Sequence, residues 1–490
     1  MIGPIPPILP PLLAYLALTL GVALWAGRRS REQQGQDFME EYFIGGRSLG
    51  GFVLAMTIVA SYTSASSFVG GPGFAHKLGL SWILLAMIQV PTVFLTIGVL
   101  GKRFAIVARH YRAVTISDFL RARYRSRAVA TVCAVFLLVF FVAAMLAQFI
   151  GGARLFQTVT GHSYHVGLTL FGLLVVLYTS IGGFRAVVLT DALQGMVMLV
   201  AATLVLVAVV GHIGGVERGM RELAAIDPGL ITPYGPGNAV PQPFILSFWI
   251  LVGLGILGLP QTVQRCMAYK NTQAMHRAMV MGTVIMGFLL LALHLVGALG
   301  RVIVPDCQPE AAIPTLIGQL FPPVWAGIFI AGPMAAIMST VDTMLLLASA
   351  ALIKDMYIEW RHAGDASLAP PRRIRNLTIC STLALGLLVY ALALDPPDLL
   401  VWINLFAFGG LEAAFCWPLL LGLYWSRANA TGALCSSLVG VGSFLAISIL
   451  KPPLGGVHAI VPSLLLALLA FLAGNAAHGR RVASPAKPTA

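Results

Sequence analysis

The sequence predicts an all-α polytopic membrane protein in which about thirteen transmembrane helices form one membrane domain. Of its 490 residues, 58% are hydrophobic and only 10% are charged, whereas soluble domains carry about 25% charged residues. Apolar runs of about 20 residues, the length that crosses a bilayer, recur along the chain. They lie at about 8–26, 50–74, 82–101, 128–150, 164–181, 189–211, 243–264, 279–300, 323–349, 377–394, 399–423, 431–450 and 459–475.

The distribution of basic residues predicts the orientation of these helices. If the N-terminus is outside, the cytoplasmic segments hold 25 of the 31 lysines and arginines, and the outer segments hold the other 6. Basic residues accumulate on the cytoplasmic side, so we expect an N-out, C-in protein of the cytoplasmic membrane. The net charge of +13 is then a topology signal, which argues against nucleic acid as a partner. The six cysteines are scattered singly, so neither a zinc site nor a disulfide framework is predicted.

The stretch 55–73 is an apolar segment with a polar interruption. Hydroxyl-bearing residues occupy six of the seven positions 61–67, and Gly-Gly-Pro-Gly follows at 70–73. Unpaired polar groups cost several kcal/mol in lipid, so this segment is expected to line a cavity within the protein. A hydrophobic helix interrupted in this way is typical of a transporter binding site. The alternative is that the small hydroxyl residues only allow close helix packing.

A second interrupted segment, GLGILGLPQ at 253–261, lies five predicted spans after the first. Because five is odd, the second set of spans is inverted relative to the first. Paired broken helices in inverted halves are expected of secondary transporters. We therefore expect a first helix at 1–27, a first repeat at 48–214, an inverted second repeat at 243–426, two C-terminal helices at 427–478 and a cytoplasmic tail at 479–490.

Oxygen-bearing residues on two predicted spans suggest a cation site. Ala336, Ser339 and Thr340 stand at i, i+3 and i+4, so they share one helix face. Set against backbone carbonyls at Ala60 and Thr63, where the first interrupted segment unwinds, they make an all-oxygen cage. Hard cations take oxygen ligands, and a cage without carboxylates favours a monovalent ion. From the second span alone, hydroxyls bonded to carbonyls of the preceding turn are an equally good interpretation.

Ionisable residues within membrane spans are functional candidates. Asp191 is interpreted either as a relay for the coupling cation or as a partner of Arg185. Asp342 either lines the cytoplasmic exit path or caps a loop, and Glu412 is expected to make a structural hydrogen bond. Gln89 either contacts a polar solute or bonds to a neighbouring helix.

Several segments resemble the sodium:solute symporter family, in the same order over nearly the full chain. They include FIGGRSLG (43–50), the first interrupted segment, GGFRAVVLTDALQ (182–194), LPQTVQR (259–265) and AAIMST (335–340). The resemblance implies a leucine-transporter-like fold with an inverted five-helix repeat and alternating access. It also implies Na⁺ as the coupling ion, without a further cofactor, on a site formed by Ala60, Thr63, Ala336, Ser339 and Thr340.

For the solute, the resemblance implies contacts near Tyr62, Ser67, Gln89 and Gln261. Asp191 stands where the family has a Thr-Asp pair linked to cation coupling. Proline-type members have an aspartate where this chain has Tyr62, which argues against a proline-type binding mode. The solute that the resemblance implies is pantothenate, and the alternative is another small carboxylate, vitamin or amino acid.

The sequence also bears on rival functions and partners. It contains no HExxH, no nucleophile–base signature and no Walker motif, so a membrane-embedded enzyme is not expected. A channel or a sodium-dependent sensor could have the same all-oxygen cation site, but neither need exchange labelled for unlabelled solute across the membrane (counterflow). No lysine or arginine is predicted at mid-membrane, so a solute carboxylate is expected to rely on helix N-termini or on Arg154. The expected partners are Na⁺, the solute and the bilayer, with no obligate protein partner evident.

Overall fold

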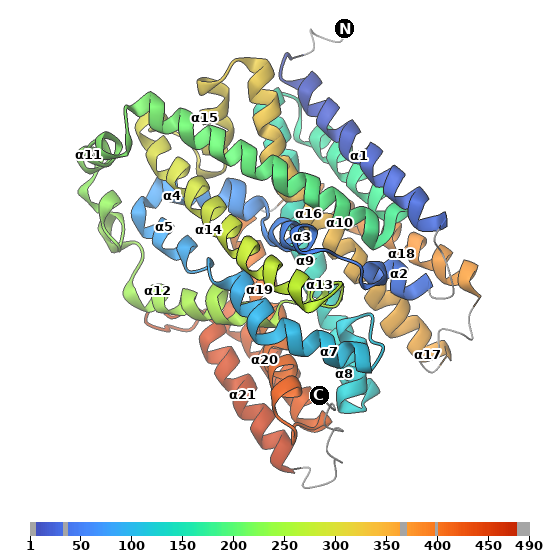
Figure 1. The fold of residues 1–490 in the computed structure, drawn as a ribbon. Coiled ribbons are helices and arrows are strands. Elements are labelled where there is room, and N and C mark those ends of the chain that lie inside the picture. Colours follow the sequence, from blue (N-terminus) through green and yellow to red (C-terminus); the bar gives the residue numbers. More distant parts are fainter. Residues whose placement is uncertain (1–5, 33–37, 363–369, 397–399, 478–490) are drawn as a thin grey trace.

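Helix α16 (Pro323–Ala350) lies in the middle of the bundle, which explains why apolar residues occur on every side of it. The computed structural model describes residues 6–32, 38–362, 370–396 and 400–477. The membrane-spanning window of α16 is 94% buried, against 33–78% for the other long helices described. Figure 1 shows the neighbours that enclose it. They are α1 (Leu9–Glu32), α3 (Gly51–Tyr62), α9 (Arg127–Thr160) and α10 (Tyr164–Ile213).

The remaining elements are also helical. The first half continues with α2 (Phe38–Ile44), η2 (Ser66–Gly70), α4 (Gly71–Leu78), α5 (Leu80–Met87), α6 (Thr92–Leu95), η3 (Thr96–Gly101), α7 (Lys102–His110), α8 (Ile116–Tyr124) and α11 (Val216–Ile226). The second half comprises α12 (Gln242–Phe248), η6 (Trp249–Leu254), η7 (Gly255–Gly258), α13 (Pro260–Arg265), α14 (Thr272–Ile303), α15 (Ala312–Leu320), η9 (Ala351–Ile358), α17 (Glu359–His362), α18 (Pro371–Leu392), α19 (Leu400–Tyr424), α20 (Ala430–Leu450) and α21 (Ile460–Ala477).

The first predicted interruption is a break between two helices. Helix α3 ends at Tyr62, Thr63 is extended (φ −72°, ψ 121°), and the helix resumes through η2 into α4. The two parts are bent by 72° relative to each other. The break leaves backbone carbonyls near the middle of the bundle without helical partners, which is tolerated there because the segment lies within protein rather than in lipid.

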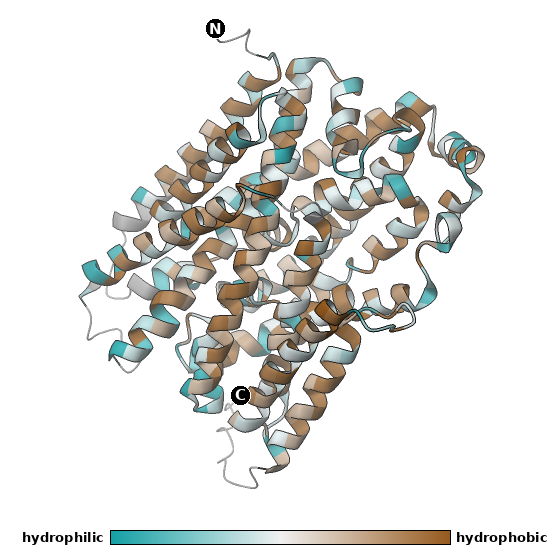
Figure 2. Ribbon diagram, turned by 180° about the vertical axis from the view of Figure 1, so that it is seen from behind, coloured by the Kyte–Doolittle hydropathy of each residue, from teal (hydrophilic) through white to brown (hydrophobic). Residues whose placement is uncertain are grey.

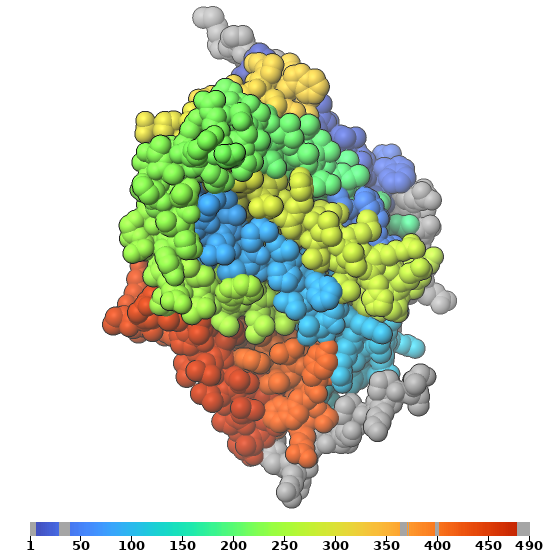
Figure 3. Space-filling model, turned by 60° about the vertical axis from the view of Figure 1, so that its left-hand side comes forward, coloured from blue at the N-terminus to red at the C-terminus, as the bar shows by residue number. Residues whose placement is uncertain are grey.

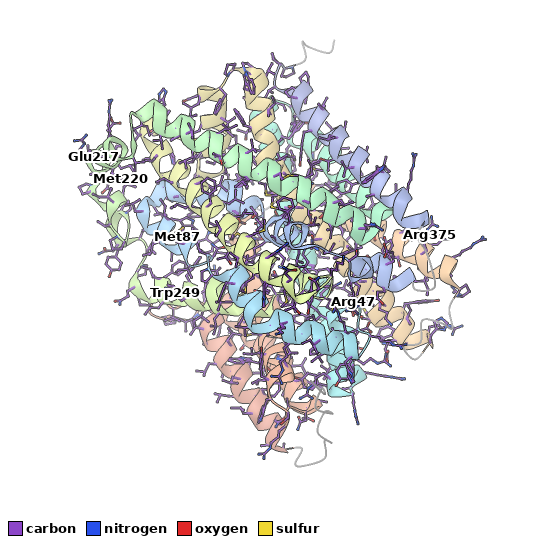
Figure 4. All side chains as sticks on the ribbon, viewed as in Figure 1. Arg47, Met87, Glu217, Met220, Trp249 and Arg375 are labelled. Atoms are coloured by element: carbon purple, nitrogen blue, oxygen red, sulfur yellow. The ribbon has the colours of Figure 1, made fainter. Side chains whose placement is uncertain are left out.

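The second predicted interruption is also present. The segment from α12 to α13 changes from α-helix to a π-helical turn and then to a 3₁₀ turn, and Leu259 is extended (φ −77°, ψ 113°). Pro260 opens α13, a position where its missing N–H costs nothing. Trp249, 51% exposed, projects from the outer side of this segment (Figure 4).

The number of membrane-spanning helices depends on how two irregular segments are counted, α10 and the segment 243–264. Among the described residues, ten helices are long and apolar enough to cross a membrane, or eleven when the bent pair is counted as one span. The predicted spans 164–181 and 189–211 are joined in α10, which bends at Gly183 (φ 62°, ψ −171°). The predicted span 243–264 is divided into short pieces. The predicted tail 479–490 lies outside the described residues.

The surface agrees with a membrane environment. Apolar residues run along the helices, and polar residues gather at the helix ends and loops (Figure 2). On one face, α5 lies between the connection that contains α11 and the helix α14 (Figure 3). Helix α4, which continues the first broken helix, also packs against α14, and this contact matters for the cavity described below.

One close approach gives a stability prediction. A β-carbon at Gly73 would lie 1.9 Å from the backbone oxygen of Pro309, so a side chain there requires a backbone shift. We expect Gly73→Ala to destabilise the protein by about 1–3 kcal/mol, measured as a lower temperature of thermal unfolding in detergent. Gly442→Ala is the matched control because nothing lies within 4 Å of its added carbon. Equal unfolding temperatures for the two variants would contradict this packing.

Candidate ion and solute sites

The five residues predicted to bind a cation lie together between α3 and α16. The Ser339 hydroxyl donates to the carbonyl oxygens of Ala60 (2.8 Å) and Ala336 (3.1 Å). The Thr340 hydroxyl donates to the carbonyl oxygens of Thr63 and Ala336, both at 2.9 Å. All five residues are at most 1% exposed. Three carbonyls and two hydroxyls thus converge across the break in the first discontinuous helix.

This oxygen cluster has the chemistry that a hard monovalent cation needs. The oxygens are neutral, and those of Ala60 and Thr63 are available because the helix ends there. The hydroxyl of Thr63 is buried and has no hydrogen-bond partner among the described residues, which provides a further oxygen beside the cluster. Ligand oxygens of a hard cation such as Ca²⁺ lie about 2.3–2.6 Å from the ion, so the hydroxyl protons must turn away from the carbonyls when an ion binds.

Three of the four predicted solute residues line one cavity. Tyr62, Ser67 and Gln89 border an internal space of about 50 Å³, which has room for only a few water molecules. The Tyr62 hydroxyl donates to the Gln89 side-chain oxygen (2.7 Å) across this space. The space is too small for a solute of more than a few heavy atoms, so a solute that binds here must widen it and replace this bond.

Gln261 is not among the residues that line this cavity. Its side chain in α13 is 1% exposed, and neither its nitrogen nor its oxygen has a hydrogen-bond partner among the described residues. The structure thus separates Gln261 from the other three predicted solute residues. A buried amide without a partner is energetically costly.

Asp191 forms a buried ion pair with Arg265. The Arg265 guanidinium lies 2.7 Å from the Asp191 carboxylate, and the two side chains are 2% and 0% exposed. The Thr57 hydroxyl donates to the same carboxylate oxygen (2.5 Å). This corrects two expectations. Arg185 pairs instead with Glu41, and an arginine that the charge distribution assigned to a loop lies inside the bundle.

Asp342 is also buried and lies near this ion pair. Its carboxylate accepts a hydrogen bond from the Tyr178 hydroxyl (2.9 Å). Arg265 also donates to the hydroxyl of Thr343, which in turn donates to the Ser339 carbonyl (2.8 Å). Asp342 is 0% exposed, so it does not cap a loop. A continuous polar network therefore connects the Asp191–Arg265 pair to the oxygen cluster.

Other polar side chains hold the break in place. The Gln148 side-chain oxygen accepts from the Ala65 amide (2.8 Å), and its nitrogen donates to Asn404 (3.2 Å). Glu412 is 1% exposed, and its Oε2 atom has no hydrogen-bond partner among the described residues. A β-carbon at Gly255 would lie 2.3 Å from that atom. Glu412 thus packs against the second broken helix and lacks the hydrogen bond that the sequence suggested at this oxygen.

The end of the bundle that carries α8 and α17 is closed by polar contacts. Arg121 pairs with Glu359 (2.6 Å), and the Thr115 hydroxyl donates to Asp355 (2.6 Å). Arg123 donates to three backbone carbonyls at 422, 425 and 428, near the end of α19. On the same side, Arg47 (Figure 4) lies 2.7 Å from Glu40 and donates to the carbonyls at 113 and 267. Opening this end requires these contacts to break.

Arg154 lies away from the solute cavity. Its guanidinium is 3.6 Å from Glu310, and it lines a separate surface cavity of about 570 Å³ with Tyr164, His165 and Asp395. Arg154 is not among the described residues that line the cavity bordered by Tyr62, Ser67 and Gln89.

Two broken helices, with an oxygen cluster at the first break, define the class of protein: a membrane transporter built on discontinuous helices. The model of the sodium:solute symporter family matches residues 42–440, and the chain belongs to that family. It is 49% identical to the sodium/pantothenate symporter of Escherichia coli (strain K12), over 95% of each chain. It is 32% identical to the osmoregulated proline transporter of Bacillus subtilis (strain 168), over 88% of each chain.

Solved structures support the same fold. A Na⁺-coupled sialic acid symporter in a substrate-bound, outward-open state superimposes with a TM-score of 0.79, at 18% identity, over 96% of each chain. Mhp1, a nucleobase-cation-symport-1 transporter in a closed conformation, gives a TM-score of 0.52 at 17% identity over 89% of this chain and 95% of that chain. The predicted family is confirmed, and so is the prediction that the chain is a transporter rather than an enzyme.

The bond between Tyr62 and Gln89 gives a prediction for solute recognition. Tyr62→Phe removes the hydroxyl but keeps the ring, so the free Gln89 amide remains available to the solute. Because the solute no longer has to replace the Tyr62–Gln89 bond, we expect its KM to fall by about threefold to tenfold, the usual value of one neutral hydrogen bond. The affinity for Na⁺ measured without solute should be unchanged. Tyr164→Phe, outside this cavity, is the control for the substitution itself. An altered Na⁺ affinity of Tyr62→Phe in the absence of solute would contradict the division between ion and solute residues.

Proposed function

We propose that the chain imports pantothenate across the cytoplasmic membrane by symport with Na⁺, through alternating access. The observation that carries this proposal is the cluster of five oxygens on Ala60, Thr63, Ala336, Ser339 and Thr340, which joins the broken helix to α16. The identity of the solute rests on relatives that are 48–49% identical over at least 95% of the chain and carry the name sodium/pantothenate symporter.

We further propose thirteen spans with the N-terminus outside and the C-terminus inside. The kink at Gly183 divides α10 into two spans, and the pieces between 242 and 265 together make one. With the bent pair counted once, this gives thirteen from the helices described. The first repeat at 48–214 and the inverted repeat at 243–426 then each begin with a broken helix, as the shared hydropathy pattern suggests.

Sodium binding is proposed to order the solute site. In the ion-bound form, the hydroxyl oxygens of Ser339 and Thr340 face the ion, and their protons no longer bond to the carbonyls of Ala60 and Thr63. The ion thus replaces two hydrogen bonds between α3 and α16 with stronger charge–dipole contacts. Tyr62 precedes the extended residue Thr63 directly, so fixing this turn also fixes one wall of the cavity.

The solute is proposed to bind in the cavity that this ordering prepares. Pantothenate offers two hydroxyls, an amide and a carboxylate. Ser67 and Gln89 supply polar contacts, and Tyr62 packs on the gem-dimethyl portion. Gln261 is proposed to join these residues only when α13 moves. The carboxylate relies on the N-terminus of the helix that resumes after the break, where the helix dipole favours an anion.

Asp191 and Asp342 are proposed to couple ion binding to opening of the pathway. Asp191 lies in α10, its partner Arg265 lies in the second broken helix, and Thr343 connects them to the oxygen cluster. A change at the ion site thus acts on a buried ion pair that holds α13 in place. Opening towards the cytoplasm then breaks the contacts between α8 and α17, such as Arg121–Glu359.

Uptake of labelled pantothenate into proteoliposomes tests this function. An inward Na⁺ gradient is expected to drive accumulation, whereas an equal K⁺ gradient is not. Unlabelled pantothenate should compete, and proline, biotin and short-chain acids should compete weakly. Efficient competition by one of those compounds together with poor pantothenate uptake would identify another solute. Counterflow of labelled pantothenate against preloaded unlabelled pantothenate separates a transporter from a channel or a sensor.

A further inference from the structure

The solute cavity contains a polar subsite on α14 and the broken helix that the sequence did not indicate. His294 lines the cavity together with Ser66 and Gly71. The imidazole is 2% exposed and lies in a helix whose other residues near it are apolar. It is the one ionisable base among the described residues that line the cavity.

Gly71 allows this histidine to reach the cavity. A β-carbon at residue 71 would lie 2.5 Å from His294 Nε2 and 2.9 Å from the Ser66 carbonyl oxygen. Any side chain at this position would therefore displace the ring. The same approach recurs one turn along α14, where a β-carbon at Gly297 would lie 2.1 Å from the Pro72 backbone. Two glycines thus bring α14 close to the start of α4, with His294 against Gly71.

The hydrogen bond of the ring determines which nitrogen carries the proton. His294 Nδ1 lies 2.7 Å from the Leu290 carbonyl oxygen, and a carbonyl oxygen only accepts, so Nδ1 is the protonated nitrogen. The described residues that line the cavity include no carboxylate, and a buried charge without a partner is costly. The neutral ring therefore presents Nε2 towards Gly71 and the cavity as a hydrogen-bond acceptor.

Ser66 supplies the complementary group. Its hydroxyl oxygen is enclosed and has no hydrogen-bond partner among the described residues, so its proton is free to donate. Ser66 begins the π-helical turn that leads to Gly71. The subsite thus offers one acceptor and one donor. An alcohol matches this pair because its O–H donates while its oxygen accepts.

We propose that Ser66 and His294 bind a hydroxyl group of the solute and make the transporter selective for hydroxylated carboxylates. The solute O–H donates to Nε2, and the solute oxygen accepts from the Ser66 hydroxyl. Trp82, Phe248 and Leu405 line the same cavity and pack on the alkyl groups beside that hydroxyl. This proposal rests on the proposed function, because it requires the solute to bind in this cavity.

The test measures displacement of labelled pantothenate from the purified full-length protein in saturating Na⁺. The competitors are pantothenate and its analogues that lack either the 2-hydroxyl or the 4-hydroxyl. We expect the wild-type protein to bind one of these analogues about tenfold more weakly than pantothenate. His294→Leu should bind pantothenate about tenfold more weakly and that analogue almost unchanged. Ser66→Ala should reduce the same discrimination about threefold, and the exposed His276→Ala on α14 should leave it intact.

Two results would overturn the subsite. One is an equal loss of affinity for pantothenate and both analogues in His294→Leu, which shows a structural role only. The other is a wild-type protein that does not distinguish the analogues from pantothenate. If His294→Leu does not fold, the affinities of Ser66→Ala for pantothenate and for the two analogues test the subsite in the same way. Absence of Na⁺-dependent pantothenate binding by the wild-type protein would instead overturn the proposed function, and the subsite with it.

Discussion

Arg265→Ala is expected to leave Asp191 as an unpaired carboxylate in the membrane interior and to abolish uptake. The two side chains are 2% and 0% exposed and lie 2.7 Å apart. Removing one partner of a buried ion pair costs about 3–5 kcal/mol, a large part of the roughly 5–15 kcal/mol that stabilises a typical protein. The yield of folded protein and the temperature of thermal unfolding in detergent should therefore both fall.

A double variant separates stability from transport. In Asp191→Leu/Arg265→Met, the Asp191 carboxylate is no longer left without its partner, so folding should recover in part relative to the single variant. Uptake should not recover, because the link from the ion pair through Thr343 to the oxygen cluster is lost. Arg185→Ala is the control, since Arg185 is 32% exposed and pairs at the surface usually contribute at most about 1 kcal/mol. Equal stability of Arg265→Ala and Arg185→Ala would contradict the buried pair.

Ser339→Ala and Thr340→Ala are expected to weaken Na⁺ binding strongly. Each substitution removes one of the two hydroxyl ligands and keeps the apolar packing of α16. Because a lost ligand on a desolvated ion costs more than one neutral hydrogen bond, we expect the Na⁺ half-saturation of uptake to rise at least about tenfold in each single variant. The double variant should show no stimulation of uptake by Na⁺.

The matched control is Ser349→Ala on the same helix. Ser349 is buried, and within the described part of the chain its hydroxyl bonds only to the Leu346 carbonyl of its own helix, so its removal should leave the Na⁺ half-saturation unchanged. The lost bonds from Ser339 to Ala60 and from Thr340 to Thr63 are each worth about 1 kcal/mol, so the temperature of thermal unfolding should fall only slightly. A large fall would indicate a folding defect rather than a binding defect. Unaltered Na⁺ dependence in the double variant would disprove the ion site.

The broken helices and the oxygen cluster could be predicted from the sequence for a physical reason. Polar residues are so costly in lipid that the run at 61–67 had to lie within protein. The spacing of Ala336, Ser339 and Thr340 fixes their common face in any helix. The structure places them opposite Ala60 and Thr63, at the break that the same run predicted.

The ion pair and the position of Gln261 could not be predicted in this way. Arg265 lies near the end of a predicted span, where a count of basic residues assigns it to a loop. Its partner Asp191 is 74 residues away. Between 242 and 265 the helix changes type three times, so the face presented by α13 does not follow from a period of 3.6 residues. Gln261 therefore does not line the cavity, although a regular helix would have suggested that it does.

The sequence did not point to His294 as a site residue, because its access to the cavity depends on two segments that lie far apart in the chain. In its own segment it is a single histidine in an apolar helix, with no partner at helical spacing. The residue that gives it access to the cavity is Gly71, and that relation exists only once α14 is seated on α4. Gly70 and Gly71 are helical in the structure and the break lies at Thr63 instead, so the role that the structure gives Gly71 is to leave room for an imidazole.

Equilibrium binding to the purified protein measures whether Na⁺ and pantothenate are coupled through the turn at Tyr62 and Thr63. Affinity for pantothenate should be measured against Na⁺ concentration, and affinity for Na⁺ against pantothenate concentration. Each ligand is expected to strengthen the other by the same factor, at least about fivefold, and Ser339→Ala/Thr340→Ala is expected to remove this coupling. If pantothenate binds the wild-type protein equally well with and without Na⁺, the two sites are not coupled through this turn.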